Sequence, residues 1–230
     1  MTTTYTVFQE QLPDLFRKWS QEYALYVPAS AGGGFFDLKP WREGLEVAWE
    51  YDVAYNPPKR FLLPPRETLV RYDLRKYTAE PVFEAPKQIL FGLHPYDLKA
   101  VNQLDQLMEG GSPDQNYLRR REATVIMALD PLTVSPTAFW SSIGGDHVNH
   151  GFDLYWTKIG PASFLVAVGS PRGEELLRAA GELLPATAAD REAARRAKLR
   201  AHALARSNSL KYNWEDRKST RLNSSHVALS

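Results

Sequence analysis

Two apolar stretches, QILFGL at 88–93 and ATVIMAL at 123–129, restrict the fold of this chain more than any other feature. Each stretch has the length of a strand and is apolar on both faces, as a strand covered on two sides must be. Between them, apolar residues recur every three or four positions over 95–108, and 116–122 is short and charged, which predicts two helices. A strand–helix–strand succession favours parallel strands joined by a right-handed crossover. The sequence therefore predicts an α/β fold.

The segments around this unit predict further strands and helices. Large apolar residues at helical spacing over 6–22 predict an amphipathic helix, whereas 25–72 reads as short strands (LYVP, FFDL, LEVAWEYDV, TLVRYD) separated by glycine and proline. Residues 152–159 and 163–169 predict two more strands, and 171–184 a helix packed on the sheet. We expect a mixed, partly parallel sheet flanked by helices, with a mainly β N-terminal portion.

The region from residue 186 onward changes in composition to alanine, arginine and lysine, which predicts a helix. Its basic residues could suit an RNA backbone or an acidic lipid face, but a solvated helix leading to a further segment explains them better. We therefore expect an α/β domain over 1–185, which can be divided into a β-rich lobe (23–85) and an α/β lobe (86–185). A helical connector at 186–215 follows.

Composition excludes several classes of protein. Hydrophobic residues make up 43% of the 230 residues and aromatic residues 12%, enough for a packed core. The net charge of +1 gives no reason to expect nucleic-acid binding. Neither a secretory leader pattern nor an apolar run near the roughly 18 residues of a membrane span is visible, so we expect a cytoplasmic chain. The sequence has no cysteine, which excludes disulfides and thiolate-held iron–sulfur clusters within these residues.

The segment LHPYD, which directly follows the first buried strand, is the strongest local candidate for a site. Open α/β sheets bind ligands at the carboxyl ends of their strands, and His94 and Asp97 lie at that point. A structural alternative is that these two residues cap the following helix, because an acidic group near a helix start satisfies free backbone N–H groups.

A second candidate is the loop GGDHVNHGFD at 144–153. It contains His147 and His150 with Asp146 and Asp153 beside them, which are residue types that bind zinc. On a loop, however, this spacing fixes no geometry, so a metal site remains an alternative.

Several segments resemble a known family, the 4Fe-4S dicluster proteins. That family includes the β subunits of sulfhydrogenase-type nickel–iron hydrogenases and one of the subunits of anaerobic sulfite reductase. The resemblance covers about 61–184 well and the N-terminal third loosely. It implies an electron-transfer subunit in which an α/β domain precedes a ferredoxin-like domain with two 4Fe-4S clusters. The segments that carry it are FLLPPRETLVRYD, ILFGLHPYDLKAVNQLDQL, NYLRRREATVIMALDP, FWSSIGG, GFDLYWTKIG and FLVAVGSPRGEELL.

The chain departs from that family at positions where many relatives carry cysteine. Tyr96, Ala138 and Trp140 occupy such positions, and Asp130 lies near another. Bulky aromatic groups would fill the space of a cluster, so we expect this domain to bind no additional one. Taken together, the two local candidates and these family positions give the residues that could line a pocket or contact a partner: His94, Tyr96, Asp97, Asp130, Trp140, Gly144, Asp146 and His147.

The final residues raise a separate expectation. The segment 216–226, DRKSTRLNSSH, is identical to the translation of a widely used sequencing-adapter oligonucleotide. We expect that 216–230 is an artefact, that the natural sequence is interrupted near Glu215, and that the cysteine-rich domain lies beyond it.

The resemblance implies partners and a function. The partners would be the other components of a redox complex, namely a hydrogenase or a sulfite/sulfur reductase and a flavin- or NAD(P)-binding subunit. No cofactor is expected in this chain itself. Two alternatives stay open. One is a non-redox small-molecule-binding or regulatory domain with a pocket at His94, Asp97 and 144–147, and the other is a metal hydrolase that uses His147 and His150.

Overall fold

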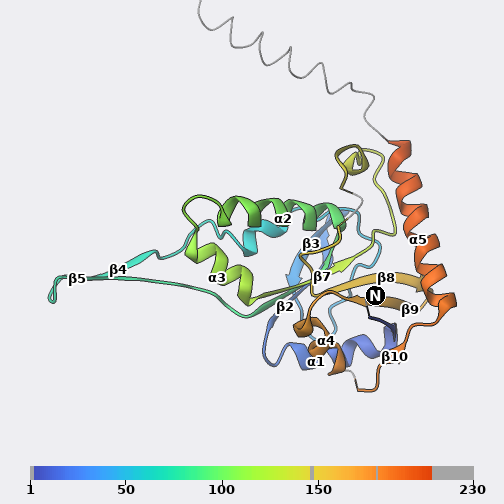
Figure 1. Cartoon of the computed structure of the whole chain (residues 1–230), viewed down its shortest axis with the longest axis horizontal. Helices are drawn as coiled ribbons and strands as arrows, with labels where there is room; N and C mark the ends of the chain where they lie inside the picture. Colours follow the sequence, from blue (N-terminus) through green and yellow to red (C-terminus); the bar gives the residue numbers. More distant parts are fainter. Residues whose placement is uncertain (1–2, 146–147, 180, 209–230) are drawn as a thin grey trace, which may run out of the picture.

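A computed structural model describes residues 3–145, 148–179 and 181–208. Its centre is an eight-stranded sheet in the order β10-β1-β9-β8-β7-β6-β2-β3 (Figure 1). Strands β2, β6, β7 and β8 run parallel, and the other neighbours pair antiparallel, so the expected mixed, partly parallel sheet is confirmed. The strands are β1 (Thr4–Phe8), β2 (Ala24–Gly32), β3 (Phe35–Pro40), β6 (Gln88–Leu93), β7 (Thr124–Leu129), β8 (Leu154–Gly160), β9 (Ser163–Val168) and β10 (Leu184–Pro185).

Helices cover both faces of this sheet. In Figure 1, α2 and α3 lie on one side and α1 and α4 on the other, while α5 runs along the ends of β8 and β9. Side chains satisfy free N–H groups at three helix starts, since Asp114 begins α3, Ser170 begins α4 and Thr187 begins α5. The helices are α1 (Leu12–Trp19), α2 (Pro95–Glu109), α3 (Gln115–Ala123), α4 (Pro171–Arg178) and α5 (Ala188–Ser207), with 3-10 turns η1 (Gln9–Gln11), η2 (Pro58–Phe61) and η3 (Trp140–Ile143).

The central strands are apolar on both faces because each face has its own core. In β6, Ile89 and Phe91 belong to the core beneath α1 and α4, whereas Leu90 belongs to the core beneath α2 and α3. Strand β7 divides in the same way, with Val125 on one side and Ile126 on the other. Full burial of such a side chain contributes about 1.5–3 kcal/mol, so these two strands carry much of the stability.

The N-terminal expectation is partly wrong. Residues 6–8 belong to strand β1 and not to a helix, and the helix proper begins at Leu12. The cause is distant pairing, because β1 lies between β9 and β10. The expected helix over 171–184 is likewise too long, since α4 ends at Arg178 and Leu184 joins β10.

The strand expected over 45–53 does not form. The adjacent residue Ala54 makes an isolated bridge to Phe36. The alternation over 45–53 is nevertheless real. Leu45, Val47 and Trp49 pack against the core and Tyr51 is buried, while the residues at 46 and 50 are exposed. The segment therefore lines the sheet as an extended cover without a hydrogen-bonded ladder.

Helix α5 packs against the body along its alanine side. Ala194, Ala201 and Ala205 are buried, and the Ser141 hydroxyl donates to the Ala205 carbonyl over 3.1 Å. The helix expected at 186–206 is thus present, but one of its sides is not solvated. Residues 209–230, which include the end of the expected connector and the adapter-like segment, lie outside the described residues. Over the described ranges, no helix has both the length and the apolarity that crossing a membrane requires.

Candidate functional site

The carboxyl ends of β6 and β7 bring two sequence-predicted residues to the same edge of the sheet, His94 and Asp130. A bulge at Gly92 shapes this edge, because the pairing register between β6 and β7 shifts there. Gly92 has a φ of +86°, and a Cβ at this position would meet the Pro28 ring at 3.0 Å. The Gly92 carbonyl accepts a hydrogen bond from the buried Tyr51 hydroxyl at 2.5 Å.

His94 is fully buried, and both of its ring nitrogens face backbone carbonyls. Nδ1 lies 2.8 Å from the Leu129 carbonyl oxygen, and Nε2 lies 3.0 Å from that of Tyr51. Burial lowers the pKa of His94, although the two carbonyl oxygens act in the opposite direction. The ring stacks on Tyr51 at a centroid distance of 4.1 Å. His94 therefore ties three segments together and has no free nitrogen with which to bind a metal ion.

The expected helix-capping role of His94 and Asp97 is only partly seen. His94 occupies the position before α2 but makes no capping bond with its side chain. Asp97 lies in the first turn of α2, and burial raises the pKa of its carboxyl to about 7. The side chain has no hydrogen bond or ion pair to any residue in the described ranges. Asp97 is therefore a carboxyl group able to exchange a proton near neutral pH.

Tyr96 and Trp140 lie side by side, with ring centroids 5.7 Å apart in a stacked arrangement. Tyr96 also contacts His94 at 5.3 Å and donates its hydroxyl to the Asp52 carbonyl, while Trp140 meets His202 of α5. Tyr96 and Trp140, two of the three positions at which the family resemblance implies cysteines, are thus adjacent in space and are filled by packed aromatic rings.

Asp130 belongs to a separate buried network on the side of β8. Its carboxylate accepts hydrogen bonds from the Tyr155 and Thr157 hydroxyls, both at 2.5 Å. Lys198 of α5 brings its ammonium group to 3.7 Å from the same carboxylate and lies 4.1 Å from the centre of the Tyr155 ring. Asp130 thus connects the sheet to α5.

A cleft of about 400 Å³ opens beside Asp130, between β8, the loop after β7 and α5. Its size suits a small ligand, and its lining contains carboxylates and cationic groups together. Of the sequence-predicted site residues that the structure describes, Asp130 alone lines this cleft; His94, Tyr96, Asp97, Trp140 and Gly144 lie outside it. The charged or polar lining residues are Glu50, Asp130, Thr157, Lys158 and Arg200.

Gly144 lies beside α2, where its carbonyl accepts a hydrogen bond from the ammonium group of Lys99 at 2.6 Å. Two further candidates, Asp146 and His147, lie outside the described residues. Of their expected metal-binding neighbours, His150 is exposed. No group of three or more His, Asp or Glu side chains able to hold a metal ion forms within 3–145, 148–179 and 181–208.

Asp153, the fourth residue of the expected metal group, has a different role. It is buried and accepts hydrogen bonds from the Ile126 N–H, the Ser170 hydroxyl and the Arg172 guanidinium. The Arg172–Asp153 ion pair is 3.1 Å long. These contacts fix the start of α4 against β7, so the carboxylate is engaged in structure.

Comparison with known proteins gives one informative relationship. No protein-family model matches the chain. The β subunit of sulfhydrogenase 2 from Pyrococcus furiosus is 30% identical over 168 residues, which is 73% of this chain and 49% of the relative. This chain is similar to a hydrogenase β subunit. It spans about half the length of that sulfhydrogenase subunit, and the similarity supports the coarse family resemblance seen in the sequence.

The residues of this chain do not fit an iron–sulfur cluster. Such clusters are held by thiolates, and the 230 residues contain no cysteine. At the edge of the sheet, the available donors are already engaged, since His94 faces two carbonyls and Asp130 accepts two hydroxyl groups.

Sequence reasoning missed three residues that shape the site: Tyr51, Tyr155 and Lys198. The alternation of LEVAWEYDV was a usable signal for Tyr51, because it places this residue on the inward face with Val47 and Trp49. No local signal identifies Lys198, since its contact with Asp130 depends on how α5 packs against β8.

Proposed function

We propose that this chain is the N-terminal part of an electron-transfer subunit of a hydrogenase- or sulfite-reductase-like redox complex. The observation that carries the proposal is the 30% identity over 168 residues to a sulfhydrogenase β subunit. The α/β body supplies a rigid scaffold. Its partners are a subunit that carries out the hydrogenase or sulfur/sulfite-reducing reaction, together with a flavin- or NAD(P)-binding subunit.

The clusters of this electron carrier, two 4Fe-4S centres, lie in a ferredoxin-like domain outside these 230 residues. The lack of any thiolate in the chain and its coverage of 49% of the relative both support this division of labour. In this arrangement, α5 lies between the sheet and the cluster domain. Its contacts with β8 and η3 would fix where that domain begins.

The test is to recover the natural reading frame beyond residue 215 from the source DNA and to produce the whole protein without oxygen. We expect two downstream runs of four cysteines, about eight iron atoms per chain and the electron paramagnetic resonance signal of reduced 4Fe-4S clusters. The 230-residue chain, prepared in the same way, is the control and should contain no stoichiometric iron. A complete reading frame without clustered cysteines would refute the proposal.

The cleft beside Asp130 favours a second candidate, a small-molecule-binding or regulatory domain without a redox role. Native mass spectrometry of the whole protein decides between the two. A bound metabolite that is lost on Asp130→Leu, in a protein without iron, would favour the second candidate.

A further inference from the structure

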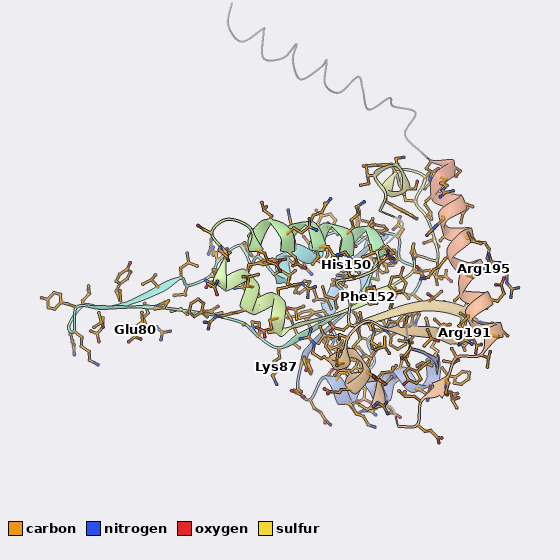
Figure 2. All side chains as sticks on the ribbon, viewed as in Figure 1. Glu80, Lys87, His150, Phe152, Arg191 and Arg195 are labelled. Carbon is orange, nitrogen blue, oxygen red and sulfur yellow. The ribbon has the colours of Figure 1, made fainter. Side chains whose placement is uncertain are left out.

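A two-stranded arm projects from the body, formed by β4 (Val70–Asp73) and β5 (Thr78–Pro81). Figure 1 shows it extending well away from the sheet and the helices, and Figure 2 shows the side chain of Glu80 far out along it. One further backbone bond, from the Val82 N–H to the Leu69 carbonyl at 2.9 Å, continues the pairing toward the body. We call residues 69–83 the arm.

The body holds the base of the arm firmly through the buried guanidinium of Arg120 in α3. This group donates to the Leu62 carbonyl at 2.6 Å, to the Glu84 carbonyl at 3.2 Å and to the Glu67 carboxylate at 2.6 Å. These contacts hold both legs of the arm, one before β4 and one after β5. The Arg119 guanidinium also lies 3.9 Å from the centre of the Phe83 ring. Helix α3 therefore contacts the chain on both sides of the ribbon, before β4 and after β5.

Beyond this base, the arm exposes large apolar side chains. Tyr72 is 70% exposed, Leu74 is 84% exposed and Tyr77 is 93% exposed. Tyr77 also has a φ of +53°, a left-handed conformation that costs a bulky residue on the order of 1 kcal/mol and that glycine or asparagine adopts more easily. The turn thus keeps an aromatic ring where folding alone favours a smaller residue.

The backbone of the arm is also incomplete by itself. A lone two-stranded ribbon is marginally stable in water, and each of its outer edges has unpaired N–H and C=O groups. A protein partner can pair with such an edge, whereas neither a lipid acyl region nor a nucleic-acid backbone can continue a strand ladder.

The charge of the arm indicates which kind of protein surface would receive it. Arg71 lies directly opposite Glu80 in the ribbon, which balances those two charges. Arg75 and Lys76 lie at the turn and form no ion pair within the described part of the chain. The nearby Asp73 carboxylate accepts the backbone N–H groups of both residues. The tip therefore offers two cations beside exposed apolar groups.

We propose that the arm is a docking element for a protein partner whose receiving surface is an apolar groove bordered by carboxylates. Tyr77 and Leu74 enter the groove, Arg75 and Lys76 pair with its acidic border, and one edge of the ribbon pairs with a strand of the partner. The partner is another subunit of the redox complex, a point that rests on the proposed function.

The test uses the full-length protein, produced in its source organism with the photocrosslinker benzoylphenylalanine in place of Tyr77. The matched control carries the same crosslinker in place of Leu107, which is 70% exposed on α2. We expect irradiation to join position 77, but not position 107, to one protein subunit of the complex. The joined peptide should contain Asp or Glu.

Charge reversal supplies the second measurement. The double variant Arg75→Glu/Lys76→Glu should lower the crosslinking yield at position 77 about tenfold, because like charges then face each other across the interface. The control Arg42→Glu/Lys59→Glu makes the same change in net charge at two exposed residues off the arm and should leave the yield unchanged.

The proposal is overturned if position 77 forms no adduct, or joins a second copy of this chain, RNA or lipid. Equal yields at positions 77 and 107, or insensitivity to charge reversal, would overturn it as well. Iron analysis of the same preparation keeps the two proposals separate. An adduct in a complex without iron–sulfur clusters refutes only the redox function, whereas clusters without an adduct refute only the arm.

Discussion

Replacing Asp97 with asparagine should stabilise the protein above neutral pH and change little in acid. The carboxyl group has a pKa of about 7 in the folded protein, raised by burial from an ordinary value of 3.8. Its proton is therefore held more tightly in the folded chain than in the unfolded chain. The stability that this proton confers is complete below about pH 4 and is lost as the pH rises through 7.

The size of the effect follows from the shift. Each pKa unit corresponds to about 1.36 kcal/mol, so the two units between pH 5 and 7 give about 2.7 kcal/mol for a fully buried group. Asp97 is only partly buried, and solvent screening reduces this value to about 2 kcal/mol. The asparagine variant has no titrating group at this position. Between pH 5 and pH 8, the free energy of unfolding of the parent should therefore fall by about 2 kcal/mol relative to that of the variant.

Urea unfolding followed by circular dichroism at pH 5 and at pH 8 measures this difference in the 230-residue chain. Asp14→Asn is the matched control, because Asp14 also lies in the first turn of a helix but its side chain is 72% exposed. The difference in free energy of unfolding between Asp14→Asn and the parent should change by less than about 0.5 kcal/mol between the two pH values. If the Asp97 variant and the parent respond equally to pH, the reasoning from burial is refuted.

Three further substitutions test the packing. Arg120→Met should lower the free energy of unfolding in urea by about 3 kcal/mol or more, because it removes the guanidinium from the Glu67 carboxylate and from two carbonyls, and Glu67 keeps only the 3.4 Å contact with Asn116; a loss below about 1 kcal/mol would contradict the role of Arg120 at the base of the arm. Gly173→Ala should lower the free energy of unfolding by about 2–3 kcal/mol, since a Cβ there would lie 2.1 Å from the Asp153 carbonyl oxygen, and an unchanged urea midpoint would contradict this close approach. Ala201→Glu should lower the melting temperature, because it places an unpaired carboxylate at a buried position. The control Leu199→Glu, on the exposed side of α5, should change the free energy of unfolding by less than about 0.5 kcal/mol. Equal effects of the two substitutions would show that α5 does not pack as described.

The parts of the fold that were predicted well are those set by local pattern. The unbroken apolar run of β6 and the helical spacing of α2 are strong local signals, and both elements lie where the sequence placed them. The start of the chain was predicted badly because the spacing of Phe8, Leu12 and Leu15 also suits a helix. Only the distant pairing of β1 with β9, which no local window contains, decides against it.

The candidate site shows the same limit. The position of His94 at the carboxyl end of a strand was predictable, but the direction of its ring nitrogens was not, because their partners come from β7 and from residue 51. The alternation over 45–53 coincides with the face that packs against the core, but the strand predicted from it does not form. Side-chain burial follows from alternation, whereas a ladder needs a neighbouring edge with free backbone groups.

The place of β1 has a consequence for how this protein is made. Of the described strands, β1 comes first in the chain, yet it pairs with β9 and with β10, and the Thr6 hydroxyl donates to the Asp190 carboxylate at the start of α5. Its partners are thus synthesised near the end of the described chain. During translation β1 therefore stays without its sheet partners while β6 and β7 can already associate, so we expect β1 to join the sheet late in folding.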